Sequence, residues 1–507
     1  MQLFSLAAHY TSGMIFQRNW PILIEGEAQA SCEITATIAA AEDKTGNTSA
    51  DTANITVKPG PFSITLPPRE AGRGLTLTLS AGDTDVLVLS DIFIGEVWFA
   101  SGQSNMQWPL NDTDEYRQNP VVRENEDLRF YTVGRNLVKS PDELDEGYKW
   151  AYSADHGWVG CNEDSAVHFS AVAYHFAHTL YDAIKIPIGI INCNVGGSSI
   201  YAWIPSNEIA ANPNISFIGH ADSKEIATID PKEARDKYYS FLDEIKKEHD
   251  TSSNIANTAK ELPVVYYDTP GPYRFQRSEI LYRSMLERIS TFPARGMLWY
   301  QGESECSYAG GKVYAEALES LVGNMKCRQN NPDFAFNFVQ LAPFYDPGSP
   351  YWATVCDQMR RFFLRHPDYA MVTIGDVGCA LDIHPQLKRP VGERLAYAAM
   401  HRSYDLEHEF TGPIAESAIR VGDEVRVSFI HGAGLHQRPV DMGCFEFVYD
   451  DDTVKKVVPE LRDNAVYLPL SDGPTPKFVR YEFVADPKIG LYNRNGFPAS
   501  LFELEIK

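Results

Sequence analysis

Four short apolar runs in this chain each end abruptly in small or polar residues. The first run covers residues 93–100 and leads into the segment Ser-Gly-Gln-Ser-Asn-Met. Between the first two runs, residues 169–185 repeat apolar side chains at every third or fourth position, which is typical of a helix with one buried face. Buried strands that alternate with helices predict an α/β fold, in which a mostly parallel sheet is covered by helices on both faces. The other three runs are residues 188–191, 297–300 and 369–374.

The residues that follow these runs are expected to gather at one edge of the sheet. Parallel strands bring their carboxyl ends together, and this edge carries the ligand site in open α/β sheets. The first run places Ser104 in the turn that follows it. Because Pro109 lacks an amide hydrogen, at most about one helical turn can follow Ser104, and even one turn supplies unpaired amide hydrogens. Chemistry is therefore expected beside Ser104.

The two ends of the chain have a different periodicity. Between residues 21 and 89, apolar and polar residues alternate in short pieces, which predicts a small antiparallel sandwich or a decoration of the sheet edge. Alternation returns after about Gly412, where residues 418–421 and 425–429 flank a Gly-Asp pair as in a hairpin. We therefore expect two β-sandwich-like regions around the α/β region. The expected domains are a β domain at 1–90, an α/β domain at 91–408 with an insertion at about 205–273, and a β domain at 409–507.

The charge and composition of the chain exclude several kinds of partner. Its 507 residues carry a formal net charge of −23, which disfavours nucleic acids and anionic membrane surfaces. No run approaches the ~18 apolar residues that a membrane-spanning helix needs, and the first residues lack the pattern of a secretory signal. The eight cysteines are scattered without a Cys-x-x-Cys pair, so we interpret most of them as buried thiols. We expect a cytoplasmic protein, or a secreted one if a signal peptide has been removed.

Potential catalytic partners of Ser104 follow the last of the four runs. Asp382 and His384 stand two residues apart in the segment Asp-Ile-His-Pro. A nucleophilic serine needs a base for its proton, and a carboxylate on the other imidazole nitrogen fixes the tautomer and stabilises the imidazolium. In an extended segment the side chains of Asp382 and His384 leave the same face, so the two can meet. Asp376 is the rival carboxylate, and the sequence leaves the choice between the two open.

A serine hydrolase also needs hydrogen-bond donors for the oxyanion of its tetrahedral intermediate. The sequence offers the amide of Ser104, an amide of Gly196 or Gly197, and the carboxamide of Gln301. The glycine pair follows the second run, where the absence of a side chain allows close approach. Gln301 follows the third run. Taken singly, a glycine pair is more often a tight turn, and a glutamine after a strand more often makes a local hydrogen bond.

Together these segments resemble the SGNH-type hydrolases of the sialate O-acetylesterase group, which also includes acetyl xylan esterases. The resemblance implies a flavodoxin-like parallel sheet and a serine esterase that removes acetyl groups from sugars without a metal or other cofactor. It also implies Ser104 as nucleophile, His384 as base and Asp382 as the residue that orients the base. Gln301 stands where the wider superfamily has asparagine, and the aspartate lies two rather than three residues before the histidine. The similar segments are residues 14–18, 102–106, 169–174, 190–192, 196–203, 299–304, 382–385, 392–395 and 483–502.

Aromatic side chains beside these segments are candidates for substrate binding. Trp108, Trp203 and Tyr300 could stack on a sugar ring, although core packing is the more common role of such residues. Glu303 could hold the loop of its segment or be a solvated carboxylate. The expected partner is an acetylated sugar or oligosaccharide, such as acetylated sialic acid or xylan.

Other classes of function fit the sequence less well. A metal-dependent deacetylase is disfavoured because the histidines are dispersed and no His-Glu-x-x-His segment occurs. An α/β-hydrolase places its serine in Gly-x-Ser-x-Gly, whereas Met106 stands at the final glycine position here. The remaining alternative is a non-catalytic carbohydrate-binding protein on an esterase scaffold. Such a protein would not need Ser104 or His384, so the presence of both favours an esterase.

Overall fold

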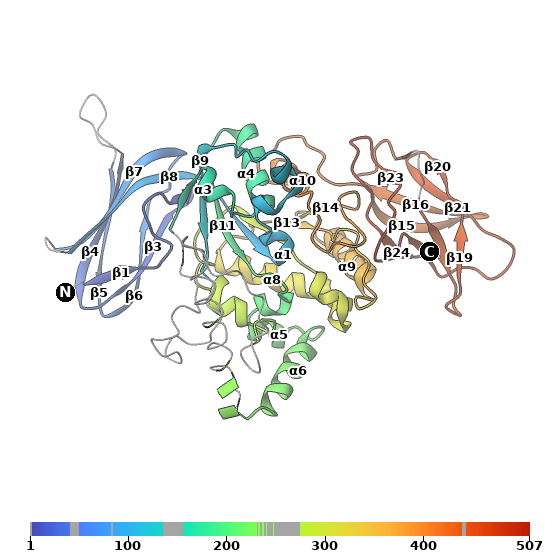
Figure 1. Cartoon of the computed structure of the whole chain (residues 1–507), viewed down its shortest axis with the longest axis horizontal. Coiled ribbons are helices and arrows are strands. Elements are labelled where there is room, and N and C mark those ends of the chain that lie inside the picture. Colours follow the sequence, from blue (N-terminus) through green and yellow to red (C-terminus); the bar gives the residue numbers. More distant parts are fainter. Residues whose placement is uncertain are drawn as a thin grey trace.

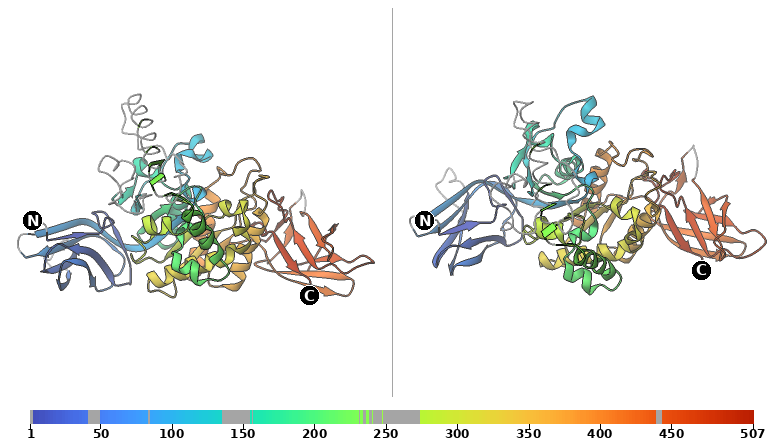
Figure 2. Two further views of the ribbon diagram at one scale, coloured as in Figure 1. Left: turned by 90° about the horizontal axis from the view of Figure 1, so that it is seen from below. Right: turned by 60° about the horizontal axis from the view of Figure 1, so that its bottom comes forward.

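The computed structural model places an α/β region between two β-rich ends (Figure 1). The strands near the N-terminus lie at one end of the molecule and those near the C-terminus at the other in all views (Figure 2). None of the helices in the described part of the chain combines the length and the apolar character that a membrane crossing needs. The structure describes residues 3–40, 50–82, 85–134, 155, 157–230, 232–233, 236–237, 240, 247, 274–438 and 443–507.

The central sheet has the topology that the four apolar runs predict, with additional strands. Its strands are parallel from β9 to β14, while β10 pairs antiparallel with β9. Strands β11, β8, β12, β13 and β14 lie side by side in the flavodoxin-like order 2-1-3-4-5. The predicted α/β class is therefore confirmed, whereas β9 and β13 were not expected. From one edge of the central sheet to the other, the strands are β10 (Val159–Cys161), β9 (Asn125–Thr132), β11 (Ile188–Asn194), β8 (Asp85–Gly102), β12 (Gly296–Tyr300), β13 (Ala335–Val339) and β14 (Ala370–Val372).

Helices cover both faces of this sheet, as expected for strands that are buried throughout. In Figure 1, α4 (Ala171–Ile184) and α10 (Arg389–Ser403) lie above the sheet, and α8 (Tyr314–Arg328) and α9 (Trp352–Arg365) lie below it. The predicted helix at 169–185 is α4. Its first turn is capped by Ser170, whose hydroxyl accepts from the Ala173 amide at 3.2 Å. It ends at Lys185, which has a left-handed φ of +54°.

The N-terminal strands follow the predicted alternation and merge with the central sheet. In β6 (Gly60–Leu66) buried apolar residues alternate with exposed residues, as in a strand with one buried face. β8 is 18 residues long, and its first half pairs with β7 while its second half lies in the parallel sheet. The expected boundary at residue 90 therefore falls inside a strand. The other N-terminal strands are β1 (Phe4–Leu6), β2 (Ile15–Gln17), β3 (Ile22–Ala28), β4 (Cys32–Ala40), β5 (Ala50–Val57) and β7 (Gly72–Ala81).

The C-terminal strands form two four-stranded antiparallel sheets that share a separate apolar core. The predicted hairpin is confirmed: β15 (Ile414–Val421) and β16 (Glu424–Ile430) pair around Gly422, whose φ is +62°. One sheet continues from β16 through β21 (Ala465–Pro469) to β20 (Glu460–Arg462). The second contains β19 (Val454–Val457), β18 (Phe445–Val448), β22 (Phe478–Tyr481) and β24 (Phe502–Glu505), and β17 (His436–Gln437) pairs with β23 (Leu491–Tyr492).

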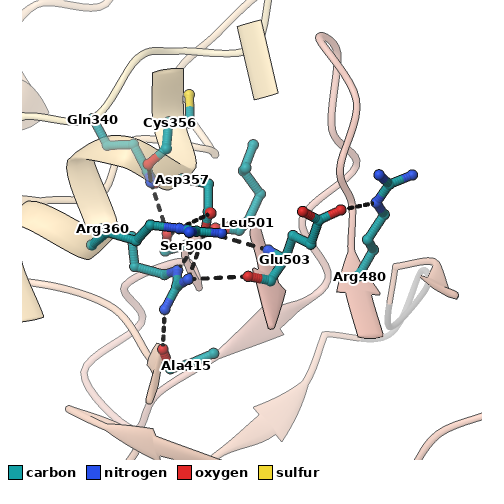
Figure 3. Close-up of polar contacts among 10 residues, drawn as sticks. Gln340, Cys356, Asp357, Arg360, Ala415, Arg480, Ser500, Leu501 and Glu503 are labelled. Carbon is teal, nitrogen blue, oxygen red and sulfur yellow. Dashed lines mark hydrogen bonds and ion pairs between the residues drawn. The ribbon is translucent and has the colours of Figure 1, made fainter. Parts of the chain in front are cut away.

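A buried arginine joins α9 to the C-terminal sheets (Figure 3). Arg360 is 1% exposed and donates to Asp357, one turn earlier on α9, at 2.7 Å. The same guanidinium donates to the carbonyl oxygens of Ala415 at 2.7 Å and Glu503 at 3.3 Å. A buried charge with this many acceptors fixes the orientation of the C-terminal sheets on the α/β region.

Most of the expected insertion at 205–273 lies outside the described residues. Its first part forms two helices, α5 (Ser206–Ala211) and α6 (Ser216–Ala227). After the insertion, buried Arg277 forms ion pairs with Asp222 and Glu225 of α6. The described start of the insertion is thereby tied to the segment that leads into β12.

Candidate active site

Three parallel strands end together around Gly102, at the carboxyl edge of the sheet. Gly102 is the last residue of β8, and it is in register with Asn194 of β11 and Tyr300 of β12. Its φ of +137° favours glycine, and a Cβ atom there would lie 2.1 Å from the Tyr300 carbonyl oxygen. The single helical turn that follows is α1 (Ser104–Gln107). Ser104 is thus delivered to the point where the strand order of the sheet reverses.

The structure brings Ser104 and His384 into contact although they are 280 residues apart in the sequence. The Nε2 atom of His384 lies 2.8 Å from the Oγ atom of Ser104, within reach for proton transfer. Trp108 stacks on the imidazole, with the ring centroids 4.7 Å apart and the planes at 24°, and so limits its rotation.

The environment of His384 favours its neutral form. Burial and the charge of Lys388 lower the pKa of His384 below the ordinary value of 6.5, while the carboxylate of Asp382 partly offsets them. At about pH 7 the imidazole is therefore uncharged, which is the form that can accept a proton from a hydroxyl group.

The two candidate carboxylates have different partners. Asp382 accepts from the backbone amide of His384 at 2.9 Å and from Gln386 at 3.3 Å, so it lies within the histidine loop. No residue in the described ranges forms a hydrogen bond with the Nδ1 atom of His384. Both oxygens of Asp376 accept from Arg394, at 2.7 and 2.8 Å. Both carboxylates thus have other hydrogen-bond partners, and neither contacts the Nδ1 atom of His384 within the part of the chain that the structure describes.

The two glycines after β11 differ in the use of their amide hydrogens. Gly196 donates to the side-chain oxygen of Gln107 at 2.8 Å, which ties its loop to α1. Gly197 is exposed, has a φ of +66°, and its amide has no acceptor within the part of the chain that the structure describes. The Ser104 amide, at the start of α1, likewise has no acceptor among those residues. The amides of Ser104 and Gly197 are thus available to an oxyanion, and that of Gly196 is engaged.

The structure corrects the expectation for Gln301, whose carboxamide hydrogens are already used. The side chain is 0% exposed. Because a carboxamide has two hydrogens, neither is left for a substrate oxygen in this arrangement. Gln301 instead links the loops that follow β8, β11 and β12. Its Nε2 atom lies within hydrogen-bond distance of Gln103 Oε1, the Ser198 carbonyl oxygen and Glu305 Oε2.

The aromatic candidates for substrate binding divide into one partly exposed ring and two buried ones. Trp108 is partly exposed beside His384, and its indole Nε1 donates to the Asp112 carbonyl oxygen at 3.0 Å. Trp203 and Tyr300 are 0% and 1% exposed, and Trp203 packs edge-on against Trp299. A ring buried to this degree cannot stack on a sugar. The prediction that Trp203 and Tyr300 bind substrate is therefore wrong, and Trp108 stays the candidate.

A buried polar cluster lies beside the nucleophile, and only its member Glu303 was a candidate in the sequence. It consists of Asn105, Glu303 and Lys388, which we call the Lys388 cluster and which are 1%, 6% and 2% exposed. The Asn105 amide donates to Glu303 at 2.6 Å, and its oxygen accepts from the Lys388 ammonium. Burial raises the pKa of Glu303 and lowers the pKa of Lys388 to about 7. The available signals were the position of Asn105 directly after Ser104 and a lysine four residues after His384.

The cysteines are free thiols with varied exposure. Cys161, Cys193, Cys306 and Cys356 are buried, and the other four are partly or fully exposed. Burial raises the pKa of Cys161 to about 12, so its thiol is protonated at neutral pH. Within the described ranges, no three His, Cys, Asp or Glu side chains gather in a way that could hold a metal ion.

Comparison with known proteins relates the chain to carbohydrate esterases. Residues 270–401 match the family described as carbohydrate esterase, sialic acid-specific acetylesterase. Sialate O-acetylesterase from Mus musculus is 25% identical over 404 residues, a match that covers 74% of this chain and 68% of the mouse protein. The protein of the same name from Homo sapiens is 24% identical over 355 residues, covering 65% of this chain and 58% of its own length.

A solved structure shares the fold over the whole chain. A carbohydrate acetylesterase from Xanthomonas citri superposes with a TM-score of 0.76 at 24% sequence identity, covering 99% of each chain. Both β-rich ends and the α/β region therefore have counterparts in one known arrangement. The region matched by the family, residues 270–401, contains His384 and Gln301, while Ser104 lies outside it.

Proposed function

We propose that this chain, whose residues 270–401 match the sialic acid-specific acetylesterase family of carbohydrate esterases, hydrolyses O-acetyl esters on sugars with Ser104 as nucleophile. The contact between Ser104 and His384 carries this proposal. A hydroxyl group 2.8 Å from a neutral imidazole is prepared for attack on a carbonyl carbon. A non-catalytic carbohydrate-binding protein would have no need of this contact.

In the first half of the reaction, the Ser104 oxygen attacks the acetyl carbonyl carbon while His384 takes the hydroxyl proton. The carbonyl oxygen becomes an oxyanion, and the free amides of Ser104 and Gly197 are the donors proposed to stabilise it. When the intermediate collapses, the bond to the sugar oxygen breaks and the imidazolium donates its proton to that oxygen. The free sugar leaves, and the acetyl group stays on Ser104 as an ester.

In the second half, water attacks the acetyl ester of Ser104 while His384 accepts a proton from the water. Collapse of this second intermediate releases acetate, and the proton returns to the Ser104 oxygen. Asp382 is proposed to stabilise the imidazolium in both halves, because it is the acidic residue whose charge favours protonation of His384. The leaving oxygen belongs to the sugar in the first half and to Ser104 in the second, and His384 donates a proton to each, so the same base and oxyanion donors serve both halves.

The proposed substrates are acetylated sugars of the sialic acid or xylan type. The relatives from mouse and human carry the name sialate O-acetylesterase, which supports an acetylated sialic acid as one candidate. Trp108 offers the partly exposed ring on which a sugar bearing the acetyl group could lie beside the nucleophile.

Labelling with a fluorophosphonate, followed by assays of acetate release, tests the proposal. We expect the wild-type protein to be labelled and the Ser104→Ala variant not to be. Ser307→Ala is the matched control, because Ser307 is an exposed serine whose hydroxyl donates only to the nearby Ser304 carbonyl oxygen among the described residues. Labelling that persists in Ser104→Ala would refute the assignment of the nucleophile.

The substrate class is tested separately, with acetylated sialic acid, acetylated xylan and aryl acetates. Release of acetate from at least one sugar, lost in Ser104→Ala, is the expected result. A protein that is labelled at Ser104 but releases acetate from none of the sugars would be an esterase for another acyl group. A protein that binds these sugars without labelling or hydrolysis would be a carbohydrate-binding protein.

A further inference from the structure

We infer that Lys388 is a positioning residue of the proposed hydrolysis, whose buried ammonium group keeps the imidazole of His384 neutral and ready to accept a proton. The inference rests on the proposed role of His384 as base. It assigns a task to the Lys388 cluster, which the mechanism above does not use.

The cluster holds the Lys388 ammonium at a fixed place inside the protein. Its nitrogen donates to Asn105 Oδ1, and Asn105 in turn donates to Glu303 at 2.6 Å and to the Ile383 carbonyl oxygen at 2.9 Å. Because Ile383 directly precedes His384, one asparagine side chain connects the nucleophile loop, the loop after β12 and the histidine loop. At 2% exposed, Lys388 has no route for its charged end to water without breaking these contacts.

One side chain connects the Lys388 ammonium to the histidine loop, because Asn105 contacts both the ammonium and the carbonyl oxygen of Ile383, the residue before His384. The Lys388 nitrogen lies 5.8 Å from the centroid of the Trp108 ring, and the His384 ring stacks on the same indole. The charged groups that act on His384 are Lys388, which opposes its protonation, and Asp382, which favours it. The groups that act on Lys388 are Glu303 and Asp382, and both favour its charged form against the effect of burial.

The sign of the interaction follows from the charges of the two protonated groups, which are both positive. Lys388 has its pKa lowered to about 7, and the pKa of His384 lies below 6.5. A cation in a buried site disfavours a second cation beside it, so His384 stays neutral to a lower pH than it would alone.

The same charge has a consequence within the catalytic cycle. When the imidazole has taken the Ser104 proton, the nearby ammonium makes the imidazolium a stronger acid. A stronger acid transfers its proton more readily to the departing sugar oxygen. Lys388 would thus act through His384 without touching the reacting atoms.

The test is the titration of His384 itself, followed by NMR in protein labelled with carbon-13 at the histidine Cε1 positions. The His384→Gln variant assigns the signal among the 13 histidines. We expect the midpoint of His384 to rise by about one pH unit in Lys388→Met, because a neighbouring charge shifts a pKa by about that amount or more. Lys388→Arg, which keeps a cation, is expected to leave the midpoint closer to the wild-type value.

Two further variants guard against misfolding and nonspecific charge effects. Lys388→Met combined with Glu303→Gln removes both charges of the cluster, avoids an unpaired buried carboxylate, and is expected to raise the midpoint as well. Arg389→Met is the matched control, because Arg389 is an exposed neighbour that pairs with Glu115, and it is expected to leave the midpoint unchanged. The acid limb of kcat/KM should move with the NMR midpoint in each variant.

A His384 midpoint that stays at the wild-type value in folded Lys388→Met and in the double variant would overturn the inference. An equal shift in Arg389→Met would also overturn it, because the effect would then be one of net charge. The readout does not depend on hydrolysis: failure of Ser104 labelling would refute the proposed function while the titration still reports on Lys388. A shifted midpoint with an unmoved acid limb would refute the link to catalysis.

Discussion

Two buried charge clusters lie along the central sheet, one toward its amino edge and one at its carboxyl edge, and they differ in how fully they are partnered. Toward the amino edge, Glu96 of β8 is 0% exposed, and both of its oxygens accept hydrogen bonds. At the carboxyl edge, the Oε2 atom of Glu303 has no hydrogen-bond partner among the described residues. The donors to Glu96 are Gln17, Arg18, Arg295 and Tyr404.

The difference in partnering indicates that the Glu96 cluster has a structural role, whereas the Lys388 cluster has the properties of a functional site. The donors to Glu96 come from the segment at 14–18, from the residue before β12 and from the end of α10, so one carboxylate joins three parts of the chain. A fully partnered charge of this kind stabilises the arrangement and has no capacity left for chemistry. The Lys388 cluster is incompletely partnered and contains groups with shifted pKa values, as functional sites often do.

His384→Ala is expected to have the largest effect, and it acts on the carboxyl edge alone. Without an acceptor for the Ser104 proton, kcat for acetate release should fall by roughly 10⁴-fold or more. The thermal unfolding midpoint should change little, because the His384 ring is only partly buried. Hydrolysis assays measure kcat, and a thermal scan of the same preparation measures the unfolding midpoint. Activity within about tenfold of wild type would mean that another residue serves as base.

Glu96→Ala is expected to give the opposite pattern. It leaves Arg18 and Arg295 without their buried acceptor, and we expect a loss of about 3 kcal/mol in the free energy of unfolding, discounted because both arginines are partly exposed. The folded fraction should keep its kcat, since Glu96 lies six residues before the end of β8. Urea unfolding and active-site titration measure the two quantities. A stable but inactive variant would show that the two clusters are coupled.

A pair of aspartate variants sharpens the comparison within the carboxyl edge. Asp382→Asn should lower kcat by about 10²-fold, because the imidazolium loses its nearby negative charge. Asp376→Asn should instead lower the free energy of unfolding by about 1–2 kcal/mol, because it weakens the pair with Arg394 and leaves the histidine loop in place. Parallel measurements of kcat and urea unfolding distinguish them. The reverse pattern would make Asp376 the residue that orients His384.

The sequence predicted the sheet and the contact between Ser104 and His384 because these depend on local patterns. Apolar runs that end in small residues mark strand ends, and parallel strands bring such ends together wherever they lie in the chain. The unexpected strands have weaker patterns: β13 carries Asn337 in its middle, and β9 mixes charged residues with apolar ones. Their place in the sheet depends on neighbours that are distant in the sequence.

The errors at the site share one physical origin. Whether Gln301 offers a hydrogen to substrate depends on Glu305 and Gln103, which take those hydrogens inside the protein. Whether an aromatic ring can bind a sugar depends on its exposure. Tyr300 and Trp108 are both aromatic residues beside predicted strand ends, but Tyr300 is buried and Trp108 is partly exposed. Hydrogen-bond satisfaction and burial are properties of the packed structure, so they could not be read from residue types and spacing alone.

Tyr404→Phe is expected to have the smallest effect. It measures how much the hydrogen bond from Tyr404 contributes to the stability of the cluster around Glu96. The Tyr404 hydroxyl donates to Glu96 at 2.9 Å and accepts from the indole of Trp98 at 3.1 Å. Removing it leaves Glu96 with its other donors and Trp98 without an acceptor, so we expect a loss of about 1 kcal/mol in the free energy of unfolding. Urea unfolding measures it, and kcat should stay at the wild-type value. A loss as large as that of Glu96→Ala would mean that the tyrosine holds the carboxylate in place, and that its arginine partners contribute little without it.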